Sequence, residues 1–239
     1  MSTTNETSAL SLSNVVSGYG EAMIVQDVSC TIRPGEIFVL LGKNGMGKST
    51  LLKTVMGFLP MRGGAIRLFG EDITGQPPYR IARRAIAYTP QEQALVQDLS
   101  VGDNLRLVLR DARQLASGLE LIGSYFPFIP QRLKQKAGTL SGGEQKMLLV
   151  ARALVGKPRL MLIDEISEGL QPSVIDKLTT VFKAQREQFG TAILLIEQHV
   201  RFALDVADRY AVLKLGEIVD RGSVNEPDIE RKIIDHLSV

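Results

Sequence analysis

The chain has 239 residues, of which 44% are hydrophobic and 23% are charged, so it can bury a sizeable core and is neither disordered nor collagen-like. Its 28 Lys and Arg against 26 Asp and Glu leave a net charge of +2, which is too small to indicate nucleic acid or an anionic membrane as a partner. The longest charge-free stretch, 7–20, is shorter than the roughly 20 apolar residues that span a bilayer. The lone Cys30 and a start without a signal-peptide pattern predict a protein of a reducing, cytosolic compartment.

Regular structure is expected to begin after a polar tail at 1–9. β-favouring clusters within 10–16 and 24–32, separated by a turn-prone segment, predict two antiparallel strands. A continuous apolar run at 37–41 is typical of a strand buried on both faces, and a helix is expected at 48–56. The further elements predicted before position 90 are a strand at 65–69, a helix at 79–84 and a strand at 85–89.

The middle of the chain, 91–155, has few β-branched runs and is predicted to be a helical insertion. Its expected elements are helices at 101–109 and 119–126, then a stretch broken by prolines at 127–130. After the insertion, strands and helices alternate. The expected elements are a strand at 160–163, a helix at 172–188, a strand at 192–196, a helix at 200–207 and a strand at 210–213. The order predicts an α/β fold with a mostly parallel sheet as its core (10–90 and 156–239), an antiparallel β subdomain and the helical insertion.

Residues 42–49 match the pattern G-x-x-x-x-G-K-[ST] between an apolar strand and a helix, the context that this phosphate-binding motif requires. The glycines let backbone N–H groups turn toward phosphate oxygens at the positive end of the following helix. Lys48 is expected to reach the outer phosphates, and the Ser49 hydroxyl to bind Mg²⁺. The predicted ATP-binding residues here are Gly42, Lys43, Asn44, Gly45, Met46, Gly47, Lys48, Ser49 and Thr50.

A nucleotide site of this kind also needs an acidic metal anchor at the end of a buried strand. The run 160–163 is apolar, and Asp164 follows it at the carboxyl end, where open α/β sheets bind ligands. We therefore predict Asp164 as a magnesium ligand. The adjacent Glu165 is expected to point elsewhere and to polarise a water for attack on the γ-phosphate.

Residues 140–144, Leu-Ser-Gly-Gly-Glu, open a further helix, with Ser141 as its N-cap and Gly142 and Gly143 exposing backbone N–H groups. They predict a second anion site. Two such sites in one chain are hard to explain with one nucleotide unless the second faces another copy.

These motifs together resemble the ATP-binding subunits of ABC transporters, over about residues 10–221, and the segment 140–144 resembles the signature sequence of that family. The resemblance implies a head-to-tail dimer, homo- or heteromeric, in which each ATP is held between the phosphate loop of one subunit and the signature of the other. The residues that would bind ATP in trans are Ser141, Gly142, Gly143 and Glu144.

Other roles follow from the resemblance by position. Tyr19 matches the aromatic residue that stacks on adenine. Gln91 matches the glutamine that contacts Mg²⁺ and the attacking water and couples to the membrane partner, and 167–170 falls where the family's D-loop lies.

The sequence departs from the family pattern at three places. Ile166 follows the catalytic glutamate where proline is common, and Gln171 replaces the last aspartate of the D-loop. The position of the switch histidine falls on Gln198, with His199 one residue later. A glutamine can hydrogen-bond a γ-phosphate but cannot carry a proton. Either Gln198 lines the site and His199 is a surface or packing residue, or the register is off by one.

Short strings such as 141–145, 167–173 and 196–199 resemble the importers of branched-chain amino acids, and of urea and short amides in the same group. The resemblance implies two integral membrane permease subunits, indirectly a solute-binding protein, and a peripheral place at the cytoplasmic membrane face. The insertion 91–155 is expected to form the surface that couples to the membrane subunits. The apolar cluster 125–128 lies either on that surface or in a small satellite core inside the insertion. Two other readings stay open: a soluble ABC-type ATPase that acts on nucleic acid or ribosomes, for which a basic stripe and a second cassette are missing, and a module that binds nucleotide without hydrolysing it.

Overall fold

The computed structural model describes residues 8–91, 95–109, 111 and 113–238. Seven residues of the expected tail (1–7), and positions 92–94, 110 and 112 of the expected helical insertion, lie outside this part. The body of the protein includes Ala9, which is buried and whose N–H donates to the Ile32 carbonyl (2.9 Å). The predicted tail at 1–9 is therefore too long at its C-terminal end.

An antiparallel sheet forms from the first part of the chain. Its strand order is β2-β1-β4-β5, with β1 at Leu10–Tyr19, β2 at Ala22–Ile32, β4 at Met61–Leu68 and β5 at Glu71–Asp72. The two predicted strands pair as expected, with Leu10 opposite Ile32. The strand expected at 65–69 begins earlier, because the weakly β-forming residues 61–64 continue the pairing with β1 across register shifts.

The second sheet carries the alternation of strands and helices. Its order is β10-β9-β3-β8-β7-β6, with β3 at Ile37–Leu41, β6 at Ile86–Thr89, β7 at Leu160–Asp164, β8 at Ala192–Glu197, β9 at Arg209–Lys214 and β10 at Glu217–Ser223. The pairs from β9 to β6 are parallel and β10 is an antiparallel edge. The predicted α/β class with a mostly parallel core is thus confirmed.

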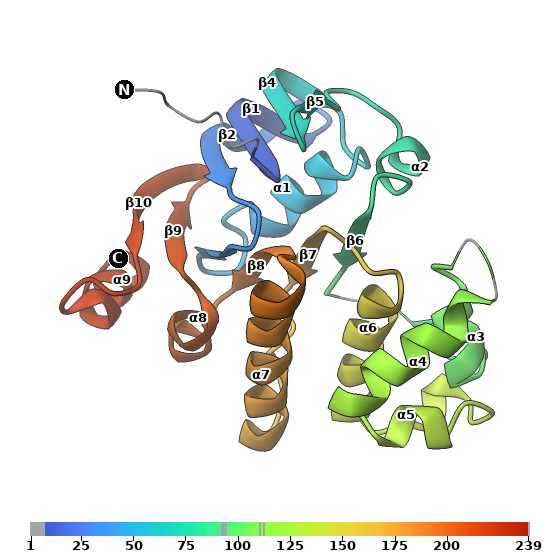
Figure 1. The fold of residues 1–239 in the computed structure, drawn as a ribbon. Coiled ribbons are helices and arrows are strands. Elements are labelled where there is room, and N and C mark those ends of the chain that lie inside the picture. The colour runs from blue at the N-terminus through green and yellow to red at the C-terminus, as the bar shows by residue number, and fades with distance from the viewer. Residues whose placement is uncertain (1–7, 92–94, 110, 112, 239) are drawn as a thin grey trace, which may run out of the picture.

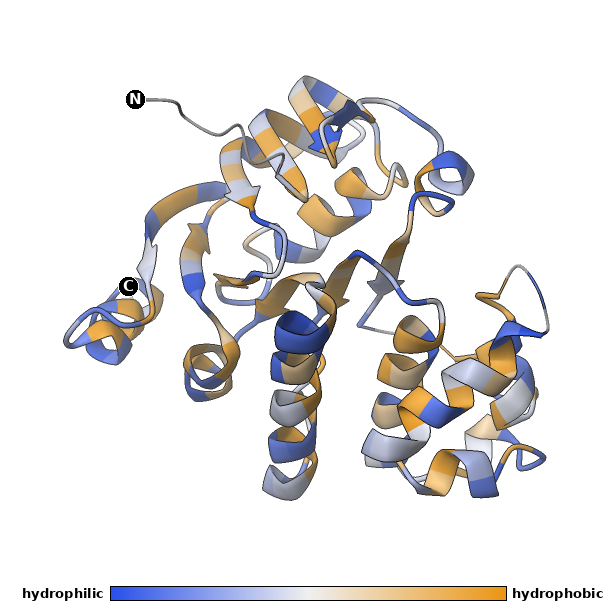
Figure 2. Cartoon of the chain, in the orientation of Figure 1, coloured by the Kyte–Doolittle hydropathy of each residue, from blue (hydrophilic) through white to orange (hydrophobic). Residues whose placement is uncertain are grey.

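Alternate side chains of the central strands enter two different hydrophobic cores. On β3, Phe38 and Leu40 face the core that contains helix α1 (Lys48–Val55) and the antiparallel sheet. Ile37, Val39 and Leu41 face the opposite core. This burial on both faces explains the continuous apolar runs, and Figure 2 shows the central strands largely in the hydrophobic colour.

The opposite core is covered by helices. They are α6 (Gly142–Val155), α7 (Pro172–Phe189), α8 (Val200–Val206) and α9 (Ile229–Ser238). Figure 1 shows α7 and α8 below the sheet, and α3 (Val101–Arg106), α4 (Gln114–Tyr125) and α5 (Phe128–Gln131) gathered with α6 at one side of the molecule. A short α2 (Pro78–Ile81) precedes β6, and a 3₁₀ turn at Ala137–Thr139 precedes α6.

Several element predictions are corrected. Helix α4 begins at Gln114, earlier than expected, and α5 occupies the stretch that was expected to be broken by proline. Pro130 fits there because the N–H groups of a first helical turn have no intrahelical partner. Phe126 is buried in the core that the helices share with the parallel sheet, and Tyr125 and Phe128 pack against this core. The cluster 125–128 is therefore part of the main core rather than a separate satellite, which favours a packing role over a coupling surface. In the part of the chain that the structure describes, no helix is long and apolar enough to cross a bilayer.

Candidate active site

The phosphate loop connects β3 to α1 in a conformation that requires glycine. Gly47 is the N-cap of α1 at φ 100°, and a Cβ there would lie 3.0 Å from the Ile24 carbonyl oxygen. A Cβ on Gly42 would lie 2.6 Å from the Leu213 carbonyl oxygen. Gly45 also has a positive φ, but open space surrounds it. The loop thus needs glycine for packing at its two ends and for backbone freedom at its centre.

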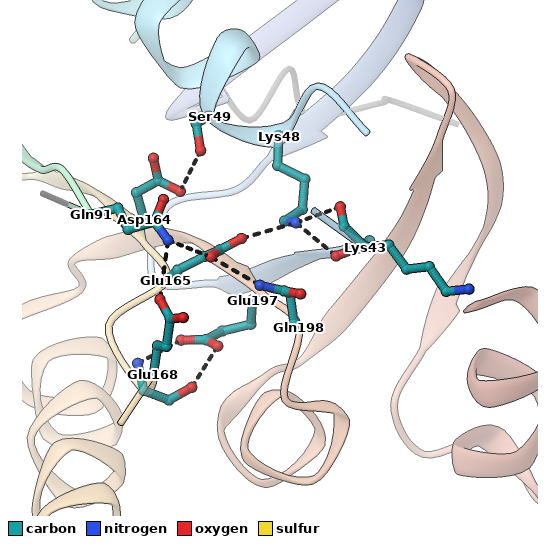
Figure 3. A network of polar contacts seen from close by, with 11 residues as sticks. Lys43, Lys48, Ser49, Gln91, Asp164, Glu165, Glu168, Glu197 and Gln198 are labelled. Atoms are coloured by element: carbon teal, nitrogen blue, oxygen red, sulfur yellow. Dashed lines mark hydrogen bonds and ion pairs between the residues drawn. The ribbon is translucent and has the colours of Figure 1, made fainter. Parts of the chain in front are cut away.

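The Lys48 ammonium sits inside this loop and is almost fully buried. Its Nζ donates to the carbonyl oxygens of Gly42 (2.7 Å) and Lys43 (2.9 Å), and it lies 2.9 Å from Oε1 of Glu165. Figure 3 shows the lysine reaching across the loop toward that carboxylate. The positive charge is therefore held by the protein itself, in the place where phosphate oxygens are expected.

Asp164 and Ser49 meet at the other side of the loop. The Ser49 hydroxyl donates to Oδ1 of Asp164 (3.1 Å), and the carboxylate is buried at the carboxyl end of β7. Burial raises the pKa of Asp164 to about 6, an effect that the Ser49 hydrogen bond opposes. A hydroxyl and one carboxylate are oxygen donors of the kind that Mg²⁺ uses together with substrate phosphates.

Glu165 is the centre of a polar network. It adopts a positive φ of 47°, and its N–H donates to the Ile196 carbonyl (2.9 Å). Besides the ion pair with Lys48, its Oε2 accepts hydrogen bonds from Nε2 of Gln91 (2.8 Å) and Nε2 of Gln198 (3.0 Å). Three segments that are far apart in the sequence thus orient one carboxylate (Figure 3).

Gln198 and His199 border the same pocket as Glu165, but among the described residues only Gln198 of the two is hydrogen-bonded to Glu165. His199 is the exposed N-cap of α8, whereas the Gln198 amide is directed at Glu165. Tyr19 ends β1 with about half of its surface exposed. No hydrogen bond joins Tyr19 to the phosphate loop within the described residues.

The segment 141–144 lies apart from this network. Ser141 and Glu144 form a capping box at the start of α6: the Ser141 Oγ accepts from the Glu144 N–H (3.3 Å), and Glu144 Oε2 accepts from the Ser141 N–H (3.0 Å). Glu144 also pairs with Arg132 (2.8 Å). A Cβ on Gly142 would meet nothing within 4 Å. The chain alone therefore gives no packing reason for this glycine.

Two carboxylates of the network had no role in the sequence analysis. Glu168 accepts from Nε2 of Gln91 (3.1 Å), and the buried Glu197 binds the Ser167 hydroxyl (2.6 Å) and N–H (3.1 Å). Burial, together with the nearby Glu165 carboxylate, raises the pKa of Glu197 to about 7, an effect that the Ser167 hydrogen bonds oppose. One signal was available: Glu197, like Asp164, ends an apolar strand of the parallel sheet.

Comparison with known proteins agrees with this geometry. The model of the ABC transporter family matches residues 25–168. The chain is 39% identical to the high-affinity branched-chain amino acid transport ATP-binding protein BraG of Pseudomonas aeruginosa, over 88% of this chain and 91% of that protein. It is 35% identical to the probable branched-chain amino acid transport ATP-binding protein LivF of Archaeoglobus fulgidus, over 87% and 89% of the two chains.

Other transport systems also appear among the relatives. The lipopolysaccharide export system ATP-binding protein LptB of Escherichia coli is 34% identical, over 91% of each chain. The crystal structure of a nucleotide-free ATP-binding cassette from an ABC transporter superposes with a TM-score of 0.84 at 24% identity, covering 95% of each chain, and supports the fold.

These matches show that the chain belongs to the ABC transporter family. Within that family it is the ATP-binding, ATP-hydrolysing subunit of a transporter. The phosphate loop fits the nucleotide, and the Ser49–Asp164 pair fits a magnesium ion, by its oxygen donors and its place beside the loop.

Proposed function

We propose that Glu165 is the general base of ATP hydrolysis in this chain, and that Lys48, Ser49, Asp164, Gln91 and Gln198 complete the site. The observation that carries the proposal is the convergence of these side chains on one carboxylate beside the phosphate loop. Mg²⁺, held by Ser49, Asp164 and Gln91, would neutralise charge on the phosphates.

Each side chain has a defined task in this proposal. Lys48 exchanges the Glu165 carboxylate for phosphate oxygens when the nucleotide enters, and this exchange frees Glu165. Glu165 then accepts a proton from the water whose oxygen attacks the γ-phosphorus, while the bond between that phosphorus and the bridging oxygen of the β-phosphate breaks. Gln91 and Gln198 keep the carboxylate oriented through the hydrogen bonds that they donate.

We infer that a second copy, or a similar subunit, completes the site with its Ser141, Gly142, Gly143 and Glu144. The exposed start of α6 offers backbone N–H groups at a positive helix end, and a Cβ on Gly142 would meet none of the described residues within 4 Å. A glycine in open space fits close approach by a ligand or by another chain. Tyr19 is proposed to stack on the adenine, since half of its surface is available.

We propose that the membrane partner binds in a groove of about 1370 Å³ beside the edge strand β6. The exposed side chains of Tyr79, Leu107 and Val108 line it, together with the half-buried Arg152. Among the described residues no carboxylate pairs with Arg152, and burial lowers its pKa. An apolar segment of a permease subunit that carries an acidic side chain would complement this groove. The groove supports a peripheral place at the cytoplasmic face of the membrane.

For the solute we propose branched-chain amino acid import, which the names of BraG and LivF support. Import of urea or short amides is the alternative within the same group. The catalytic site does not discriminate these solutes, since its residues address nucleotide, metal and water.

The test is uptake by cells in which the chromosomal gene is replaced. Wild type should support uptake of labelled leucine, whereas Glu165→Gln, which keeps the shape of the side chain but cannot act as a base, should reduce uptake at least about tenfold. Glu120→Gln, at an exposed position of α4, is the matched control. Loss of urea uptake with unchanged leucine uptake would favour the alternative. Normal uptake of both solutes in the Glu165→Gln strain would contradict import driven by this site.

A further inference from the structure

Glu197 is a buried carboxylate for which the proposed mechanism has no use. It ends β8 one residue before Gln198, and only 2% of its surface is exposed. Both of its oxygens are engaged by one residue: Oε1 accepts from the Ser167 N–H (3.1 Å) and Oε2 from the Ser167 hydroxyl (2.6 Å). Because the Glu197 carboxylate accepts hydrogen bonds from both the backbone and the side chain of Ser167, it fixes the position and orientation of that residue.

Ser167 lies in the loop 165–171, which connects β7 to α7, and the next residue, Glu168, is linked to the reacting carboxylate. Glu168 binds Nε2 of Gln91, and the same amide binds Oε2 of Glu165. Glu165 is bound in turn by Gln198, the residue after Glu197. Four hydrogen bonds thus close a ring: Glu197 to Ser167, Glu168 to Gln91, Gln91 to Glu165, and Glu165 to Gln198. The backbone supplies the two remaining links, from Ser167 to Glu168 and from Gln198 to Glu197, and Figure 3 shows the labelled members of the ring around Glu165.

We propose that Glu197 is a positioning residue for hydrolysis, which holds the 167–170 loop so that Glu168 and Gln91 keep the Glu165 carboxylate in its reactive orientation. Two further observations support this role. Glu165 and Glu197 line the same pocket, of about 380 Å³, together with Ser167 and Glu168. In addition, Glu168 and Gly169 are exposed, so the loop has little packing of its own between the buried Ser167 and Leu170, which packs against the core. The inference rests on the proposed role of Glu165.

The test compares steady-state phosphate release with ATP affinity in the purified full-length chain. Glu197→Ala should lower kcat at least about tenfold, because misplacing a catalytic group by about 1 Å is that costly, while KM for ATP stays within about threefold. Glu197→Gln should keep kcat within about threefold of wild type. Its amide oxygen can accept from the Ser167 N–H, and its NH₂ can donate to the Ser167 hydroxyl. Glu120→Ala, at the exposed α4 position, should match wild type.

A double-mutant cycle separates positioning from general loss of packing. Ser167→Ala removes only the hydroxyl and should lower kcat in part, and the Glu197→Ala, Ser167→Ala double variant should be no worse than Glu197→Ala alone. Ser167→Ala also gives a readout if Glu197→Ala fails to fold. A kcat within twofold of wild type in the folded Glu197→Ala variant would overturn the proposal, as would equal losses in Glu197→Gln and Glu197→Ala.

The Glu165→Gln variant distinguishes the two proposals. If Glu165→Gln turns over ATP as fast as wild type, the assignment of the base fails and the ring has nothing to position. If Glu165→Gln is inactive while Glu197→Ala is fully active, the base assignment stands and only the role of Glu197 is overturned.

Discussion

At the scale of single residues, the charged side chains of the site interact with one another in the absence of ligand. Lys48 is the only cation that the structure pairs with Glu165 within the described residues, and Glu197 lies close enough to Glu165 to be affected by its charge. Burial disfavours the charged form of Glu197, and the neighbouring Glu165 carboxylate disfavours it as well. The raised pKa of Glu197, to about 7, is the expected result.

This arrangement predicts a pH-dependent stability. A carboxyl group whose pKa rises on folding stabilises the folded state fully below its unfolded value, near 4.5, and loses that contribution as the pH rises through about 7. The free energy of unfolding of wild type, relative to that of Glu197→Gln, should therefore fall by on the order of 1–3 kcal/mol between about pH 5 and about pH 8.

Urea denaturation without nucleotide or metal measures this difference. Subtracting the Glu197→Gln curve removes the contribution of groups that titrate elsewhere in the chain. A difference that stays constant, or that grows with pH, would show that Glu197 is ionised throughout.

At the scale of elements, the turn between β9 and β10 supports the phosphate loop. The Gly216 N–H donates to the Met46 carbonyl (3.1 Å), the Leu215 N–H lies 3.3 Å from the Met46 sulfur, and the Gly216 carbonyl accepts from Gln26 (2.8 Å). A Cβ on Gly216, at φ +84°, would lie 2.2 Å from the Ile24 carbonyl oxygen. This turn therefore fits only with glycine in place.

Gly216→Ala should destabilise the protein by at least about 3 kcal/mol, because the backbone at Ile24 or at the turn itself must move. The variant should also weaken ATP binding, because the turn holds the phosphate loop through Met46. Gly75→Ala is the matched control: Gly75 also has a positive φ, of +67°, but nothing lies within 4 Å of its Cβ position. Its cost should be about 1 kcal/mol, without a change in ATP affinity. Chemical denaturation and calorimetric titration with ATP give the two numbers, and equal losses in the two variants would rule out the supporting role of the turn.

Elements with one dominant pattern were predictable from sequence. The apolar runs of β3, β7 and β8 and the glycine pattern of the phosphate loop predicted the parallel core and its nucleotide end. β10 and α9 were missed, because the charged residues within 217–223 obscure an edge strand that is only half-buried. The spacing of Ile229, Ile233 and Leu237 would have indicated α9.

The ring around Glu165 was only partly predictable. Gln91, Glu165 and Gln198 were each expected near the site, from resemblance or position. The role of Glu197 depends on strand register, since Asp164 lies opposite Ile196 in the sheet and Glu197 therefore follows beside Glu165. Likewise, the ion pair of Lys48 with Glu165 could be found only from the three-dimensional structure, because the sequence motif predicts contacts of the lysine with phosphates alone.

At the scale of the whole molecule, the proposed site is complete only with a second subunit. The network of Lys48, Asp164 and Glu165 and the start of α6 are separate parts of one chain, and Figure 1 shows the α3–α6 group to one side of the strands that carry the network. A dimer in which the start of α6 of one subunit covers the phosphate loop of the other would bring the two half-sites together. Loss of the γ-phosphate would then weaken the closed interface.

The most direct test is the molar mass of the chain with ATP, measured by light scattering in the Glu165→Gln background so that nucleotide is not consumed. That background should give the mass of two chains. Adding Ser141→Arg should give the mass of one chain, with ATP affinity within about threefold, because the arginine would block the interface but not the phosphate loop. Adding Ser141→Ala, which loses the cap at a cost of about 1 kcal/mol but adds no bulk, should still allow the dimer. A dimer of normal mass in the Ser141→Arg variant would contradict the shared site.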